Sequence, residues 1–130
     1  MTSSPDGSSS VRRMSVEWGA DGPWLTVALG GELDVVTAPA LLDQVGLLIA
    51  QETPPRIALE LSQLSGCDSS GINAFVRLWK RAGAAGGELV LLRPPARVAE
   101  LLNRVGLDGH LRVCARLPAV SGAGPDLDPV

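Results

Sequence analysis

Residues 59–79 read LELSQLSGCDSSGINAFVRLW, and their hydrophobic period changes partway through the stretch. Up to Leu61, apolar residues alternate with other residues, which predicts a buried strand over Arg56–Leu61. Beyond Ser70, apolar residues recur at the spacing of one helix face; they are Ile72, Phe75, Val76 and Trp79. The stretch therefore predicts a strand, a polar turn and an amphipathic helix.

The polar turn, Asp68-Ser69-Ser70-Gly71, has two interpretations. Short side chains that carry oxygen are typical of helix N-caps, so Asp68 or Ser69 could accept hydrogen bonds from the first-turn amides. Alternatively, a serine hydroxyl beside these amides is an acceptor whose charge state a partner senses, because a phosphate adds about two negative charges. Both interpretations can hold together, with one residue capping the helix and its neighbour being modified.

The whole chain predicts the order β-β-α-β-α-β-α-β. This is an α/β fold with a small mixed sheet of four to five strands and helices packed against it. A turn over Gly19–Pro23 is expected to join the first two strands into an antiparallel hairpin, and Gly30–Asp34 to break the second strand. Thr37 is the expected N-cap of the first helix. The expected strands are Met14–Trp18, Leu25–Leu29, Arg56–Leu61, Leu89–Leu92 and Leu111–Val113. The expected helices run from Thr37 to about Gln51, from after Ser70 to about Ala85, and from after Pro95 to just before Gly106.

The predicted helix between the second and third strands has a functional consequence. A crossover of this length makes the two strands parallel, so the loops that follow them lie at the same edge of the sheet. This arrangement brings GELD, residues 31–34, beside DSSG, residues 68–71. Because partners and ligands tend to use that carboxyl edge, we expect a composite surface formed by Asp34, Asp68, Ser69 and Ser70.

Composition narrows the classes of function. The 130 residues suit one domain, and a net charge of −3 with 3% aromatic residues argues against nucleic-acid binding. The sequence has neither a membrane-length apolar run nor an apolar signal core, which indicates a cytoplasmic protein without a membrane partner. We expect a disordered tail over residues 1–12, a folded domain over 13–117 and a flexible tail over 118–130.

The sequence carries none of the common catalytic or metal-binding patterns. His110 is the single histidine and is expected on a surface turn or strand edge, so serine hydrolysis lacks a base and a metal lacks a ligand set. No phosphate-binding glycine loop occurs either, and we therefore expect no metal, no cofactor and no enzyme activity. Cys67 and Cys114 are expected to be free thiols, as is usual for two cysteines in a cytosolic chain.

The motifs together resemble the STAS domain of bacterial anti-sigma factor antagonists. The resemblance covers roughly Met14 to Val113, and it depends on the order and spacing of short motifs rather than on any one of them. These are Gly31-Glu32-Leu33-Asp34, Thr37-Ala38, Leu61-Ser62-Gln63-Leu64, Asp68-Ser69-Ser70-Gly71 and Gly86-Gly87-Glu88 before an apolar strand.

The resemblance implies a partner-switching regulator of transcription in the stress-response class. In the family, the unphosphorylated antagonist binds an anti-sigma factor that is also a serine kinase of the histidine-kinase-like ATPase type, and a sigma factor is released. The kinase modifies the second serine of the motif, here Ser70, and a serine phosphatase reverses the reaction. Asp34, Asp68, Ser69 and Gly71 would belong to the same partner-binding surface.

Two alternatives use the same residues differently. The first is a STAS-type sensory or scaffold module that binds a small anion or a nucleotide at the N-terminus of the helix after DSSG. The second is an antagonist switched by oxidation of Cys67 and Cys114.

Overall fold

The computed structural model describes residues 14–106 and 111–118 of the chain. The expectations for residues 1–12, for His110 and for the tail beyond Pro118 lie outside the described residues. Five strands form one sheet in the order β1 (Met14–Asp21), β2 (Trp24–Leu33), β3 (Arg56–Cys67), β4 (Glu88–Leu92) and β5 (Arg112–Cys114). Strand β1 is antiparallel to β2, whereas β2 to β5 are parallel, so the predicted mixed sheet and element order are confirmed.

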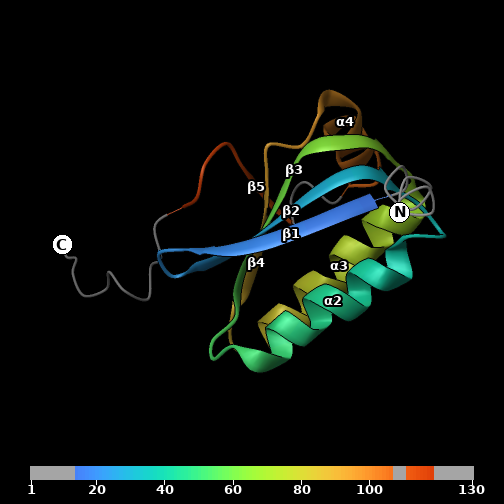
Figure 1. Ribbon diagram of the computed structural model, residues 1–130. Coiled ribbons are helices and arrows are strands. Elements are labelled where there is room, and N and C mark those ends of the chain that lie inside the picture. Colours follow the sequence, from blue (N-terminus) through green and yellow to red (C-terminus); the bar gives the residue numbers. More distant parts are fainter. Residues whose placement is uncertain (1–13, 107–110, 119–130) are drawn as a thin grey trace, which may run out of the picture.

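Three helices accompany the sheet in the described residues: α2 (Ala38–Gln51), α3 (Ser69–Ala84) and α4 (Ala96–Arg104). Helices α2 and α3 lie side by side against the sheet, and α4 lies near one end of β3 (Figure 1). The main core lies between the helices and the sheet, where Leu41, Val45, Leu59, Leu61, Phe75 and Leu78 have no exposed surface. Burial of each such side chain stabilises the folded state by about 1.5–3 kcal/mol relative to its exposure to water. Within the described ranges, no helix is long and apolar enough to cross a membrane.

The two strands that lead to the candidate site are longer than the sequence predicts. The expected break at Gly30–Asp34 is wrong, because β2 continues to Leu33 and pairs with an equally extended β3. The register shifts between Ala28 and Gly30 and again between Gly31 and Glu32, and the φ of +86° at Gly31 is a conformation that glycine adopts readily. The turn of the hairpin is correspondingly shorter than expected, since Asp21 and Trp24 are already register partners.

The predicted helix faces are only partly right. Ala74, Leu78 and Ala82 of α3 are buried, whereas Val76 and Trp79 are half-buried. This helix packs against both the sheet and α2, so its buried face is wider than the stripe predicted from the sequence. Val105, which the sequence places on the apolar face of the last helix, is instead 47% exposed, because it is the C-cap residue where α4 ends.

The opposite face of the sheet carries a second, smaller apolar cluster. Trp24, Ala58, Val90 and Leu92 are buried there, and Cys114 and Leu117 pack against them. The segment after β5 covers this face, where the indole N–H of Trp24 donates to the carbonyl oxygen of Pro118 at 3.0 Å. We call this side of the sheet the open face, because α2 and α3 both lie on the other side.

Glu60 is a charged residue of the open face whose carboxylate has several partners. Its carboxylate forms an ion pair with Arg93 and accepts a 2.7 Å hydrogen bond from the backbone N–H of Ser62. Burial raises the pKa of Glu60, but hydrogen bonds from Ser62 and the nearby Arg93 guanidinium outweigh burial and hold this pKa below its usual value. A carboxylate whose pKa is lowered by folding stabilises the protein above the unfolded-state pKa, and this contribution is lost as the pH falls through the folded-state pKa.

We therefore expect Glu60→Gln to lower the free energy of unfolding at pH 7 by about 1 kcal/mol. The difference from the wild-type protein should shrink as the pH falls from 6 to 3, because the wild-type carboxylate becomes protonated. Urea denaturation at a series of pH values measures this. A difference that stays constant over the whole range would show that the charge of Glu60 is not its cause.

Candidate functional site

The ends of β2 and β3 meet at one edge of the sheet. Leu33 and Cys67 are register partners, and the backbone N–H of Asp68 donates to the carbonyl oxygen of Leu33 at 3.1 Å. The loop that begins at Asp34 therefore starts directly beside the turn that begins at Asp68. The predicted adjacency of the GELD and DSSG segments is confirmed.

Asp34 organises the loop between β2 and α2. Its Oδ1 accepts hydrogen bonds from the backbone N–H groups of Val36 at 2.9 Å and Thr37 at 3.2 Å. The hydroxyl of Thr37 accepts from the N–H of Asp34 at 2.9 Å and donates to the carbonyl oxygen of Glu32 at 3.0 Å. Thr37 holds the N-cap position as predicted, but its side chain fixes the loop instead of capping the helix.

This tight loop presents two apolar side chains outside the core. Val35 is 69% exposed and Val36 is 56% exposed, although both follow a buried strand. The hydrogen bonds to the carboxylate of Asp34 turn the chain outward at these positions. Neither valine is among the site residues predicted from the sequence, although two adjacent valines within a polar turn are a pattern that indicates exposed apolar side chains.

Asp68 is the N-cap of α3. Its Oδ1 accepts from the backbone N–H of Ser70 at 2.8 Å and from that of Gly71 at 3.3 Å. The helix begins at Ser69, whereas the sequence predicts a start after Ser70. Asp68 and Ser69 are exposed and Ser70 is partly exposed, so the capping interpretation holds for Asp68 and leaves the hydroxyls of both serines outside the cap.

Gly71 differs from the other predicted site residues because it is buried. A Cβ at this position would lie 2.7 Å from the Sγ of Cys67 and 2.8 Å from the side chain of Leu33. The first turn of α3 therefore packs directly on the last residues of β2 and β3. Gly71 contributes this close approach rather than a surface for a partner.

The two cysteines are free thiols in the structure, as expected. Burial and the neighbouring carboxylate of Asp68 raise the pKa of Cys67 to about 12, so the thiol stays protonated at neutral pH and is a poor nucleophile. Cys114 of β5 is the register partner of Leu92 in β4, which is the register partner of Glu60 in β3. Along β3, Cys67 lies ~23 Å beyond Glu60, at ~3.3 Å per residue. A disulfide requires Cα atoms within about 7 Å, so the fold separates this pair too widely for the redox alternative through an internal disulfide.

We expect Asp68→Ala to lower the free energy of unfolding by about 1 kcal/mol, because two first-turn amides lose their acceptor. Asp68→Asn is the matched control, since its side-chain oxygen keeps the cap while the charge is removed. Thermal or urea unfolding of both variants measures the effect. Equal losses in the two variants would assign the stabilisation to charge rather than to capping.

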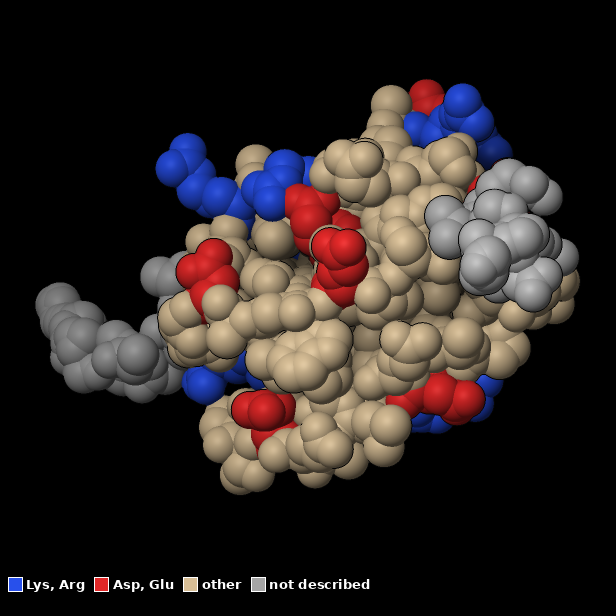
Figure 2. All heavy atoms as spheres, in the orientation of Figure 1, with Lys and Arg blue, Asp and Glu red and all other residues tan. Residues whose placement is uncertain are grey.

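The site joins two serine hydroxyls, two carboxylates and two exposed valines, and this set suits protein recognition. The first-turn amides that would attract an anion already bind the carboxylate of Asp68, which also repels negative charge. This weighs against the alternative of anion or nucleotide binding at the same position. On the face seen in Figure 2, Lys and Arg residues lie mainly at the margins and form no continuous basic area of the kind nucleic acids bind.

Comparison with known proteins identifies the family of this chain. The STAS domain family model matches residues 19–119. The anti-sigma-B factor antagonist of Bacillus subtilis (strain 168) is 32% identical over 92 residues, which covers 71% of this chain and 83% of that protein.

Solved structures share the fold at lower identity. An anti-sigma factor antagonist from Mycobacterium paratuberculosis superimposes with a TM-score of 0.73 at 22% identity, covering 82% of this chain and 89% of that chain. The antagonist SpoIIAA in its unphosphorylated form gives a TM-score of 0.65 at 22% identity, over 86% of this chain and 94% of that chain. The Bacillus SpoIIAA in its phosphorylated form gives 0.60 at 21% identity, over 86% and 97%.

Proposed function

Because this chain belongs to the STAS domain family, we propose that it is an anti-sigma factor antagonist whose unphosphorylated form binds an anti-sigma factor and so releases a sigma factor. The observation that carries the proposal is the junction of β2 and β3, which puts the loop of Asp34 and the turn of Ser70 on one edge of the sheet. The relative in Bacillus subtilis, named as an antagonist of anti-sigma-B factor, supports the assignment. The antagonist acts by binding, as a domain over residues 13–117 in the cytoplasm.

The proposed docking surface consists of Asp34, Val35, Val36, Asp68, Ser69 and Ser70. Specific interfaces combine apolar groups that become buried with a polar rim, and the two exposed valines beside the polar turn match that composition. The carboxylate of Asp34 acts from within the loop, because it holds Val36 and Thr37 in place. Loss of Asp34 would therefore disturb the position of both valines as well as remove a charge.

Ser70 is the proposed phosphorylation site. The kinase is the anti-sigma factor itself, a serine kinase of the histidine-kinase-like ATPase type, and a serine phosphatase reverses the modification. Ser70 lies in the first turn of α3 and is partly exposed, and the helix dipole offsets part of the repulsion between a phosphate there and the carboxylate of Asp68. In a complex, the same phosphate lies close to Asp68 and meets a desolvated contact, so modification opposes binding and leaves the fold unchanged.

The decisive experiment incubates the chain with its cognate anti-sigma factor and ATP and locates the phosphate by mass spectrometry. We expect modification of the wild-type protein and of Ser69→Ala at Ser70, and none of Ser70→Ala. Phosphate on Ser69 alone would overturn the choice of serine. Stable binding without any phosphate transfer would leave an antagonist that is not controlled in this way.

A further inference from the structure

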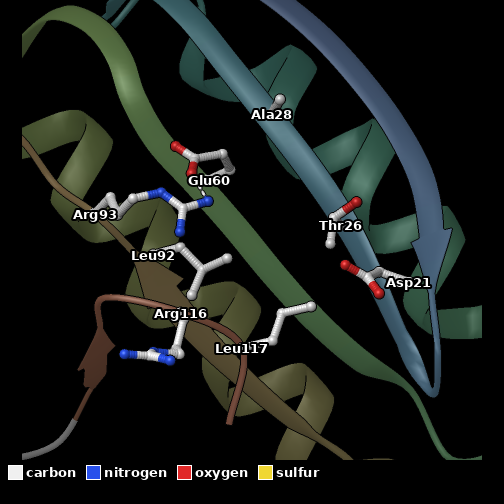
Figure 3. Close-up of a pocket in the computed structure, with 8 residues that line it drawn as sticks. All are labelled: Asp21, Thr26, Ala28, Glu60, Leu92, Arg93, Arg116 and Leu117. Atoms are coloured by element: carbon white, nitrogen blue, oxygen red, sulfur yellow. Dashed lines mark ion pairs between the residues drawn. The ribbon is translucent and has the colours of Figure 1, made fainter.

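A pocket of about 570 Å³ lies on the open face of the sheet (Figure 3). This volume falls within the range of small-molecule sites, about 300–1,000 Å³. None of the residues of the proposed docking surface lines this pocket, so a role for the pocket goes beyond the antagonist function and does not depend on it. The lining residues are Asp21, Thr26, Ala28, Glu60, Leu92, Arg93, Arg116 and Leu117.

The sheet register builds the floor of this pocket. Ala28 of β2 is the register partner of Glu60 in β3, and Glu60 is the partner of Leu92 in β4. The three side chains therefore form one row across the open face. The small side chain of Ala28 leaves room above the sheet, and Leu92 provides an apolar base beside it.

The segment after β5 forms the outer wall and is fixed by two hydrogen bonds. A guanidinium nitrogen of Arg93 donates to the carbonyl oxygen of Ala115 at 2.7 Å, and the indole of Trp24 donates to that of Pro118 at 3.0 Å. Trp24 is only 2% exposed, so this end of the wall is well packed. Leu117 is held between these two anchors, which makes the pocket a built feature of the fold.

Charges of opposite sign face one another across the pocket. The guanidinium of Arg93 lies on one side with its ion-pair partner Glu60, and the carboxylate of Asp21 points inward from the other side (Figure 3). Leu92 and Leu117 lie between them in this view, and Arg116 points away from the centre. Among the described residues, no hydrogen bond or ion pair engages the carboxylate of Asp21, whereas a guanidinium has five N–H donors and Arg93 uses only some of them.

We propose that this pocket binds a small zwitterion with an apolar body, of the size of an amino acid or a dipeptide. The ammonium group pairs with Asp21, the carboxylate pairs with Arg93, and the apolar body covers Leu92 and Leu117. The pocket combines the carboxylates of Asp21 and Glu60 with the guanidinium of Arg93, while Arg116 lies at its margin, so neither a polyanion nor a polycation is matched. Guanidinium groups bind carboxylates in a planar, two-point geometry, which suits the carboxylate end of such a ligand.

The test is a titration of the full-length, isotope-labelled chain with L-leucyl-L-leucine, followed by NMR of its amide and indole groups. We expect saturable shifts at Thr26, Ala28 and the indole of Trp24, and none at Ser69 or Ser70. N-acetyl-L-leucyl-L-leucine lacks the ammonium group and L-leucyl-L-leucinamide lacks the carboxylate, so each should bind at least about tenfold more weakly.

Two variants and a control separate this site from nonspecific binding. Asp21→Asn should lower the affinity for the dipeptide about tenfold or more, since it removes a charge-assisted contact. Ala28→Leu should block binding by filling the space above the sheet. Asp43→Asn changes an exposed carboxylate on α2, on the other side of the sheet, and should bind as the wild type does. Shifts that never saturate, or an affinity that Asp21→Asn and Ala28→Leu leave unchanged, would overturn the proposal.

Discussion

Replacement of Ser70 by Asp is expected to weaken binding to the anti-sigma factor by about a hundredfold, whereas Ser70→Ala should keep the wild-type affinity within about threefold. A like charge placed in an interface costs several kcal/mol, and each ~1.4 kcal/mol is tenfold in the dissociation constant. The carboxylate of Asp68 already lies at this helix start, where it caps the N–H of Ser70. Titration calorimetry with the purified partner measures the difference.

Two further variants separate charge from shape and position. Ser70→Asn has nearly the same shape as Ser70→Asp but no charge, and it should retain most of the affinity. Ser69→Asp puts the charge one residue earlier, at a more exposed position, and should have a smaller effect. If Ser70→Asn weakens binding as strongly as Ser70→Asp, then size and not charge controls the contact. Thermal unfolding should show that all these variants retain the fold.

The second large effect is expected for Gly87→Ala, which should lower the free energy of unfolding by about 3–5 kcal/mol. Gly87 follows α3, where its N–H donates to the carbonyl oxygen of Ala82 at 2.8 Å. A Cβ at this position would lie 1.7 Å from the carbonyl oxygen of Pro55, which itself accepts from the N–H of Glu88 at 2.9 Å. Both groups are backbone, so the clash is relieved only by moving the start of β4 away from β3. The melting temperature should fall by about 15 °C.

Gly83→Ala is the matched control for this change. Gly83 lies in α3 and is exposed, and an added Cβ would meet no atom within 4 Å beyond the adjoining backbone of its own helix. The substitution should stabilise the protein by about 0.5–1 kcal/mol, because alanine is a better helix former than glycine. Addition of a methyl group at Gly83 and at Gly87, only four residues apart, should thus have opposite effects on the free energy of unfolding. Similar losses in both variants would show that the contact with Pro55 is not the cause.

The element order and the meeting of the two loops were predictable because they depend on local patterns. Alternation predicts strands, the spacing of Ile72 and Phe75 predicts a helix, and a helical crossover between strands forces a parallel pair. The errors fall where a local signal is ambiguous. The glycines before Glu32 read as a strand break, although the neighbouring strand supplies the hydrogen bonds that carry β2 on to Leu33.

The sequence by itself determined the fold class, the family motifs and the edge of the sheet where Ser70 lies, since hydrophobic period and chain connectivity are properties of the chain alone. Only the tertiary structure decided that Asp68 caps α3, that Thr37 binds back to the loop of Asp34, and that Gly71 is buried. The pocket between Asp21 and Arg93 is likewise visible only in the tertiary structure. Such features depend on which distant backbone and side-chain groups come within hydrogen-bond or van der Waals distance, and that is fixed only when the whole sheet and its helices pack together.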